Sequence, residues 1–102
     1  MHLVQLLLPV YDDRGEKFPD GLFADVRREL TERYGGVTAY MRAPATGLWK
    51  RGEGTVDRDQ MVMVEVMVND LDHRWWADYR RQLERTFHQD VVLVRAIATR
   101  QL

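Results

Sequence analysis

The stretch MVMVEVMV at residues 61–68 constrains the fold more than any other part of the sequence. Valine occupies every second position over eight residues, which is the two-residue period of a β-strand. The valines mark one face of this strand, whereas three methionines and Glu65 mark the other. A sheet that packs helices on one side normally leaves its second side polar. Here both sides are apolar, so we expect both to be covered.

Hydrophobic periods elsewhere predict three more strands and two helices. Apolar residues recur every three or four positions in two long segments, as in amphipathic helices. Pro19 stands in the first turn of one helix and Gly35 is placed to end it. Asn69 or Asp70 is expected to cap the other helix. The expected strands cover residues 3–9, 37–42 and 91–98, and the expected helices cover residues 19–34 and 71–87.

The order of these elements predicts the fold class. Two right-handed crossovers give an antiparallel sheet in the strand order 4-1-3-2. We therefore expect an α+β fold: a ferredoxin-like βαββαβ plait, with a four-stranded antiparallel sheet and two helices on one face. Residues 46–60 contain the turn GEG and are expected to form an extra β-hairpin arm between strands 2 and 3. The 102 residues show no linker or repeat, so residues 1–102 are expected to form a single domain.

The helix-free face of this sheet bears most directly on function. The apolar residues of this face make an area larger than soluble monomers usually expose. A second copy of the chain, related by a two-fold axis, is the simplest way to cover this face. We therefore expect a homodimer. Trp49 in the hairpin arm would act as an anchor on the partner, or else pack on the edge of its own sheet. The expected interface residues are Met61, Met63, Met67, Leu93, Ile97 and Trp49.

One polar residue interrupts this face on each strand, near the middle. In the order 4-1-3-2 these residues form a row across the sheet. Charged groups buried there must be paired and hydrogen-bonded. Two hypotheses stay open: a network that sets the register of the dimer, or a pocket that orients a small organic ligand, with Glu65 as a general base. The row consists of Arg95, Gln5, Glu65 and Tyr40.

A sheet with two apolar faces in this topology resembles the dimeric α/β-barrel proteins, in which two subunits pack sheet against sheet. That family includes antibiotic-biosynthesis-type monooxygenases, muconolactone-isomerase-like enzymes, stress-responsive barrel proteins and many uncharacterised small bacterial proteins. The resemblance covers the whole chain in topology and face pattern, and it implies a homodimer. No motif in the sequence points to one subfamily, so the resemblance implies no catalytic residue.

Composition and motifs exclude several classes of function. Fifteen basic and sixteen acidic residues give a net charge of −1, which provides no field for nucleic acid or for an anionic membrane. The absence of cysteine excludes disulfides and thiolate chemistry. The three histidines lack ligand spacing, and the acidic loop at residues 11–16 lacks the spacing of a calcium loop. No run approaches the roughly 20 apolar residues of a membrane span. We expect a cytoplasmic protein without metal or cofactor.

The expected function is that of a small homodimeric binding or interaction module. The alternative is a cofactor-independent enzyme, monooxygenase- or isomerase-like, acting on a small organic substrate between the sheets. The space between the paired sheets separates the two hypotheses. A cavity of roughly 300 Å³ or more lined by the polar row favours an enzyme or a ligand binder, whereas a filled, methionine-rich seam favours an interaction module.

Overall fold

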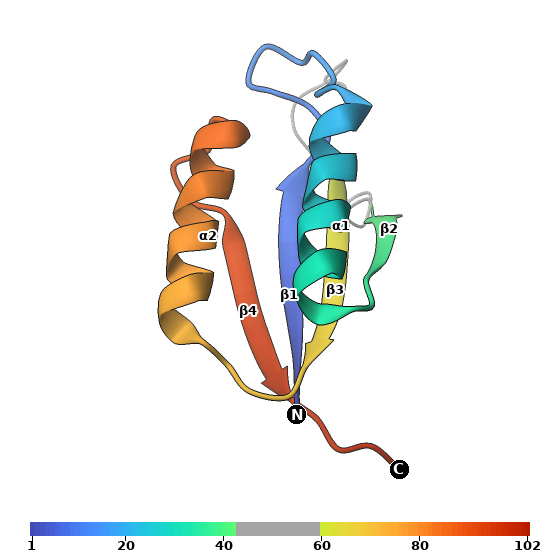
Figure 1. Cartoon of the computed structure of the whole chain (residues 1–102). Helices are drawn as coiled ribbons and strands as arrows, with labels where there is room; N and C mark the ends of the chain where they lie inside the picture. The colour runs from blue at the N-terminus through green and yellow to red at the C-terminus, as the bar shows by residue number, and fades with distance from the viewer. Residues whose placement is uncertain (43–59) are drawn as a thin grey trace, which may run out of the picture.

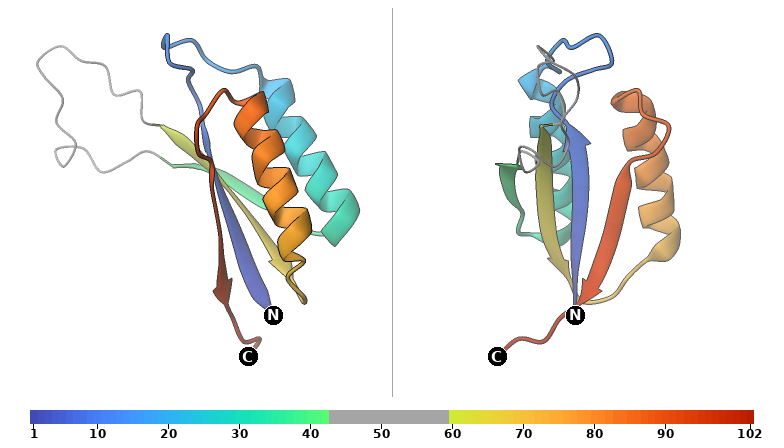
Figure 2. Two further views of the ribbon diagram at one scale, coloured as in Figure 1. Left: turned by 90° about the vertical axis from the view of Figure 1, so that its left-hand side faces the viewer. Right: turned by 180° about the vertical axis from the view of Figure 1, so that it is seen from behind.

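The computed structural model describes residues 1–42 and 60–102 as one antiparallel sheet with two helices on one of its faces (Figure 1). A view turned by 90° shows both helices on the same side of the strands (Figure 2). Within residues 1–42 and 60–102, the opposite side of the sheet carries no helix. The elements are β1 (His2–Pro9), α1 (Asp20–Tyr34), β2 (Thr38–Arg42), β3 (Met61–Val68), α2 (His73–Thr86) and β4 (Leu93–Ala98).

Strand β1 lies in the middle of the sheet and is paired on both sides. The order of neighbours is β2-β3-β1-β4, the same order of strands that the crossovers predict, counted from the other edge. β1 pairs with β3 over its whole length and with β4 over residues 2–7. All of these pairs are antiparallel. Residues directly opposite one another in such pairs share a face, so the register fixes the composition of both faces.

The predicted fold class, a four-stranded ferredoxin-like plait, is wrong. Three antiparallel strands, β3, β1 and β4, form the body of the sheet, and β2, with five residues, lies at its edge. Its pairing with β3 ends at Thr38 opposite Glu65, so among the described residues nothing pairs with the outer edge of residues 66–68. We therefore describe the architecture as an α+β fold of three antiparallel strands and two helices.

β2 begins later than predicted because of how α1 ends. Gly35 adopts φ +90° and its N–H donates to the carbonyl of Thr31 at 2.8 Å, which ends the helix as predicted. The chain then needs Gly36 and Val37 to cross back to the sheet, so β2 begins at Thr38 instead of residue 37. The predicted hairpin arm of residues 46–60, including Trp49, lies outside the described residues up to residue 59.

The core lies between the sheet and the helices. The even-numbered residues of β1 and β3 face the helices, and most of them are less than 3% exposed. The apolar stripe predicted for α2 is confirmed, because Trp76, Tyr79, Leu83 and Phe87 are all buried. The residues of this core with an exposure of 2% or less are Val4, Leu6, Leu8, Leu30, Val64, Val66, Leu83, Phe87 and Val92.

The start of α2 differs from the prediction. Asp72 is the N-cap, and its carboxylate accepts a hydrogen bond from the Trp75 backbone N–H at 3.0 Å. Asn69 and Asp70 lie in a bend before the helix and do not cap it. The sequence NDLD offers three capping side chains in four positions, and only Asp72 stands directly before the first helical residue.

An aromatic cluster joins the end of α1 to the start of α2. Tyr34 stacks on Trp76 with ring centroids 5.6 Å apart, and Trp75 stacks on Tyr79 at 4.9 Å. The Arg33 guanidinium lies 4.3 Å from the ring centroid of Trp75, an arrangement that favours a cation–π interaction. The Trp75-Trp76 pair is thus part of the contact between the two helices.

Tyr79 supplies a first prediction. Its hydroxyl is buried without a hydrogen-bond partner among the described residues, and burial, with a smaller contribution from the Glu29 carboxylate, raises its pKa above the ordinary value. The pKa of Tyr79 is raised in the folded protein. The part of the protein's stability that depends on this group is therefore complete below about pH 10 and is lost as the pH rises further. We expect Tyr79→Phe to leave the free energy of unfolding at pH 7 unchanged within about 1 kcal/mol. Above pH 10 we expect the free energy of unfolding to fall less steeply with pH in this variant than in the original chain.

Urea unfolding at pH 7 and above pH 10 measures both effects. Tyr34→Phe is the matched control, because the Tyr34 hydroxyl accepts a hydrogen bond from Arg33 Nε at 3.1 Å. A loss of stability at pH 7 in Tyr79→Phe larger than in Tyr34→Phe contradicts the assignment of an unpartnered hydroxyl.

Candidate functional site

The helix-free face of the sheet carries large apolar side chains that are open to solvent. Met67, Leu93 and Ile97 are 45%, 47% and 44% exposed. The register places Met67 and Ile97 on either side of Leu3, so together they form an apolar row across one end of the face. Three further apolar residues, Leu3, Leu7 and Met61, are half-buried.

Three polar side chains cross the middle of this face in one hydrogen-bonded row. Gln5 on β1 is opposite Glu65 on β3 and opposite Arg95 on β4. Arg95 Nε donates to Gln5 Oε1 at 2.7 Å, and Gln5 Nε2 donates to Glu65 Oε2 at 2.7 Å. Gln5 is only 8% exposed, so its amide is satisfied mainly by these two neighbours. We call these three residues the polar row.

The polar row has a direction. Each hydrogen bond is donated from the β4 side toward the β3 side, so a cation stands at one end and a carboxylate at the other. Within the described part of the chain, the terminal guanidinium nitrogens of Arg95 and the second oxygen of Glu65 have no protein partner. The row is internally bonded at its centre and has unused hydrogen-bonding groups at both charged ends.

Tyr40 does not complete the predicted row. The register of β2 places Tyr40 opposite Met63, and Thr38 stands opposite Glu65. The sequence pattern alone does not show this two-residue offset, because the connection after α1 sets where β2 joins β3. Thr38 is therefore the position at this end of the row that sequence reasoning missed.

The predicted interface residues also separate into two groups. Met67, Leu93 and Ile97 are exposed, whereas Met63 is only 1% exposed and is already buried within the chain. The register is one difference between the two methionines. Met63 has a strand on each side, with Leu7 and Tyr40 opposite it, whereas Met67 lies beyond the end of β2. Trp49 lies outside the described residues.

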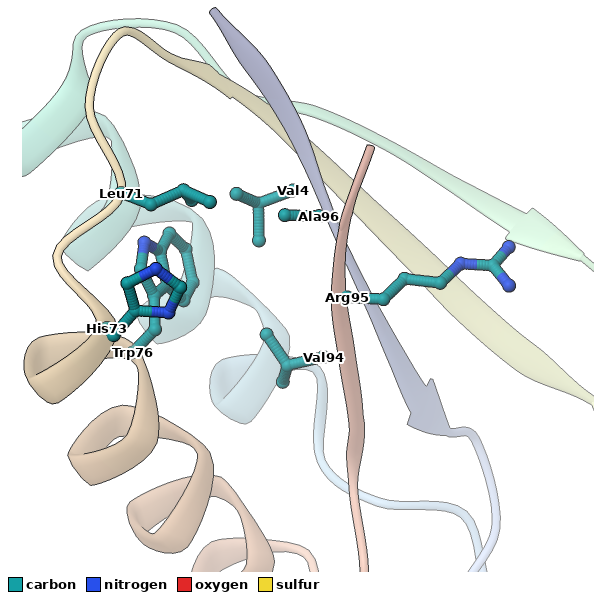
Figure 3. A pocket seen from close by; sticks show the side chains of 7 residues that line it. All are labelled: Val4, Leu71, His73, Trp76, Val94, Arg95 and Ala96. Atoms are coloured by element: carbon teal, nitrogen blue, oxygen red, sulfur yellow. The ribbon is translucent and has the colours of Figure 1, made fainter. Parts of the chain in front are cut away.

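A cavity of about 210 Å³ lies on the other side of the sheet, between α2 and the strands β1 and β4. Its walls are mainly apolar, with His73 and Trp76 on the helix side (Figure 3). Arg95 also lines it, but its side chain points away from the cavity toward the helix-free face (Figure 3). Pockets for drug-sized ligands measure roughly 300–1,000 Å³, so this cavity is small and is not the inter-sheet pocket predicted from the sequence. The other lining residues are Val4, Leu71, Val94 and Ala96.

Across residues 1–42 and 60–102, no three His, Asp or Glu side chains come together as metal ligands would. Neither described helix is long and apolar enough to cross a membrane. Comparison of the chain with models of known families, with curated proteins and with solved structures gave no match.

The polar row supplies a second prediction. Gln5→Leu keeps the size of the side chain but removes both hydrogen bonds to its charged partners, of which Arg95 is exposed and Glu65 is half-buried. Hydrogen bonds to charged groups contribute about 1.5–3 kcal/mol, and less where the charge is exposed. We expect Gln5→Leu to lower the free energy of unfolding by about 2 kcal/mol in urea.

Gln82→Leu is the control for this experiment, because Gln82 is exposed on α2. Its substitution is expected to change the free energy of unfolding by less than about 0.5 kcal/mol. Equal effects of the two substitutions would show that the polar row contributes nothing to stability.

Proposed function

We propose that this protein is a cytoplasmic homodimeric binding or interaction module, whose two subunits pack helix-free face against helix-free face. The observation that carries the proposal is the exposure of Met67, Leu93 and Ile97, each close to half open, on a single face of the sheet. Burying such side chains against apolar surface contributes about 25 cal/mol per Å² of area removed from water. The arrangement is the one implied by the resemblance to dimeric α/β-barrel proteins.

The charges on this face favour a second copy of the same chain over a different partner. A cation and a carboxylate stand at opposite ends of the polar row, on β4 and β3. A surface that carries a positive and a negative charge at equal distances on either side of its centre is complementary to a second copy of itself related by a two-fold axis. A partner of a single charge would match only one end of the row.

The dimensions of the face indicate a modest interface. Eight residues of β1 extend for roughly 27 Å, and four strands span roughly 15–20 Å. The projected area is about 500 Å² per subunit, below the roughly 800 Å² per partner of a standard stable interface. We therefore expect a dimer that dissociates on dilution. No contact among the described residues favours the enzymatic alternative over this reading.

Mass measurement gives a third prediction. At micromolar concentration, light scattering coupled to gel filtration is expected to report twice the chain mass of 12.0 kDa. The mass is expected to fall toward 12.0 kDa on dilution, because the face is small. A constant mass of one chain at concentrations up to the millimolar range ends the dimer proposal.

A charge placed on the helix-free face gives a fourth prediction. Ile97→Glu puts a carboxylate among apolar side chains in the interface, where it must lose its hydration without gaining a partner. We expect the dimer dissociation constant to rise at least tenfold, while the thermal stability of the monomer stays within a few degrees.

The matched control is Ala24→Glu, which adds the same charge on the exposed surface of α1. It is expected to leave the dissociation constant unchanged within threefold. Equal weakening by Ile97→Glu and Ala24→Glu would point to a general charge effect and against this face as the interface.

A further inference from the structure

We infer that the two-fold axis of the homodimer runs along β1 and passes beside Gln5, so that Arg95 of each subunit pairs with Glu65 of the partner subunit. This inference rests on the homodimer proposed above and assigns its register. It follows from the placement of one cation and one carboxylate symmetrically about the central strand.

The strand order sets the geometry. Neighbouring strands lie about 4.8 Å apart, so Arg95 and Glu65 stand on either side of Gln5 at about equal distances. Two sheets that meet face to face are related by a two-fold axis in the plane between them. An axis along β1 exchanges the β3 side for the β4 side, which brings each guanidinium over a carboxylate of the other subunit.

A second axis that keeps the strands of the two subunits aligned runs across the strands, along the polar row. That axis leaves each residue of the row on its own side. Arg95 would then face Arg95 of the partner subunit, and Glu65 would face Glu65 of the partner subunit. Like charges placed together away from water cost several kcal/mol, so this register is disfavoured.

Hydrogen-bonding capacity supports the same choice. Within each subunit the row uses Nε of Arg95 and Oε2 of Glu65. The terminal nitrogens of the guanidinium and the second carboxylate oxygen are the groups that a cross-subunit pair needs. Gln5 lies on the axis, where its amide already holds both charged neighbours in place.

The apolar row at the end of the face is consistent with this register. Ile97, Leu3 and Met67 are aligned across β4, β1 and β3. An axis along β1 places Ile97 over Met67 of the partner subunit and Leu3 over its own symmetry mate. Two side chains that are 44% and 45% exposed in the subunit then cover each other.

Buried ion pairs often add little net affinity, because both charges lose hydration on association. Leaving one such charge unpaired, or opposed to a like charge, is costly. The cross-subunit pairs are therefore expected to fix the register of the dimer and to exclude other arrangements. The apolar side chains supply most of the area.

Charge reversal tests this register. Glu65→Arg gives the polar row two arginines, and Arg95→Glu gives it two glutamates. We expect each variant alone to raise the dimer dissociation constant at least tenfold. Mixing the two variants is expected to give a heterodimer, and the double variant Glu65→Arg/Arg95→Glu is expected to dimerise within threefold of the original chain. Analytical ultracentrifugation measures all four, and circular dichroism checks that each variant folds.

Spin labels give a second test that keeps both charges. The chain contains no cysteine, so a single label site can be introduced by Leu3→Cys or by Met67→Cys. An axis along β1 predicts a shorter distance between labels at position 3, on the axis, than at position 67. An axis across the strands predicts equal distances at the two positions.

The possible outcomes separate the two proposals. A monomeric original chain overturns the homodimer and the register together. A dimer that keeps its dissociation constant in both single charge variants, or that gives equal label distances, overturns the register and leaves the homodimer standing. Weakened single variants with a restored mixture, or a shorter distance at position 3, support the register.

Discussion

The pairing of β1 with β3 on one side and with β4 on the other is the constraint on which the structure depends. β1, near the start of the chain, pairs with the last strand, β4, and with β3, which follows residues 43–59. Because residues opposite one another share a face, this double register builds both surfaces of the sheet at once. The residues paired with Val4, Leu6 and Leu8 face the helices. The residues paired with Leu3, Gln5 and Leu7 face the helix-free side. Alternate residues of β1 therefore belong to the core and to the candidate interface. A shift of one residue would exchange them.

Gln5 links the stability of the sheet to the proposed dimer interface. A leucine at this position would continue the apolar pattern of its neighbours, but it would leave Glu65 and Arg95 without a link. The amide has one acceptor and one donor group to offer, and the structure uses each for a different charged residue. A guanidinium and a carboxylate two strands apart are thus connected across a mainly apolar face. The connection keeps both charged ends close to the sheet, where a partner subunit can reach them.

Much of this arrangement can be predicted from the sequence, and the exceptions have physical causes. The alternation in residues 61–68 and the apolar stripe of α2 correctly separate the faces of both elements, because burial follows a short and regular period. The row formed by Gln5, Glu65 and Arg95 follows from strand order and the middle position of each residue. Tyr40 is misplaced because the length of the connection after α1 sets the register of β2, and no periodic signal encodes that length. The fold class fails for the same reason, since β2 is a short edge strand. Met63, unlike Met67, has a paired strand on each side among the described residues.

The outer edge of β4 presents a competing mode of association. Among the described residues β4 pairs with β1 alone, so its other edge offers free backbone N–H and C=O groups to a second chain. Edge pairing would satisfy those groups but would leave Met67, Leu93 and Ile97 in water, because their side chains project perpendicular to the sheet. Face packing covers these side chains and brings the unused ends of the polar row together. Exposed backbone groups are already hydrogen-bonded to water, so pairing them gains little net free energy, whereas covering apolar side chains gains in proportion to area. The balance favours association through the face.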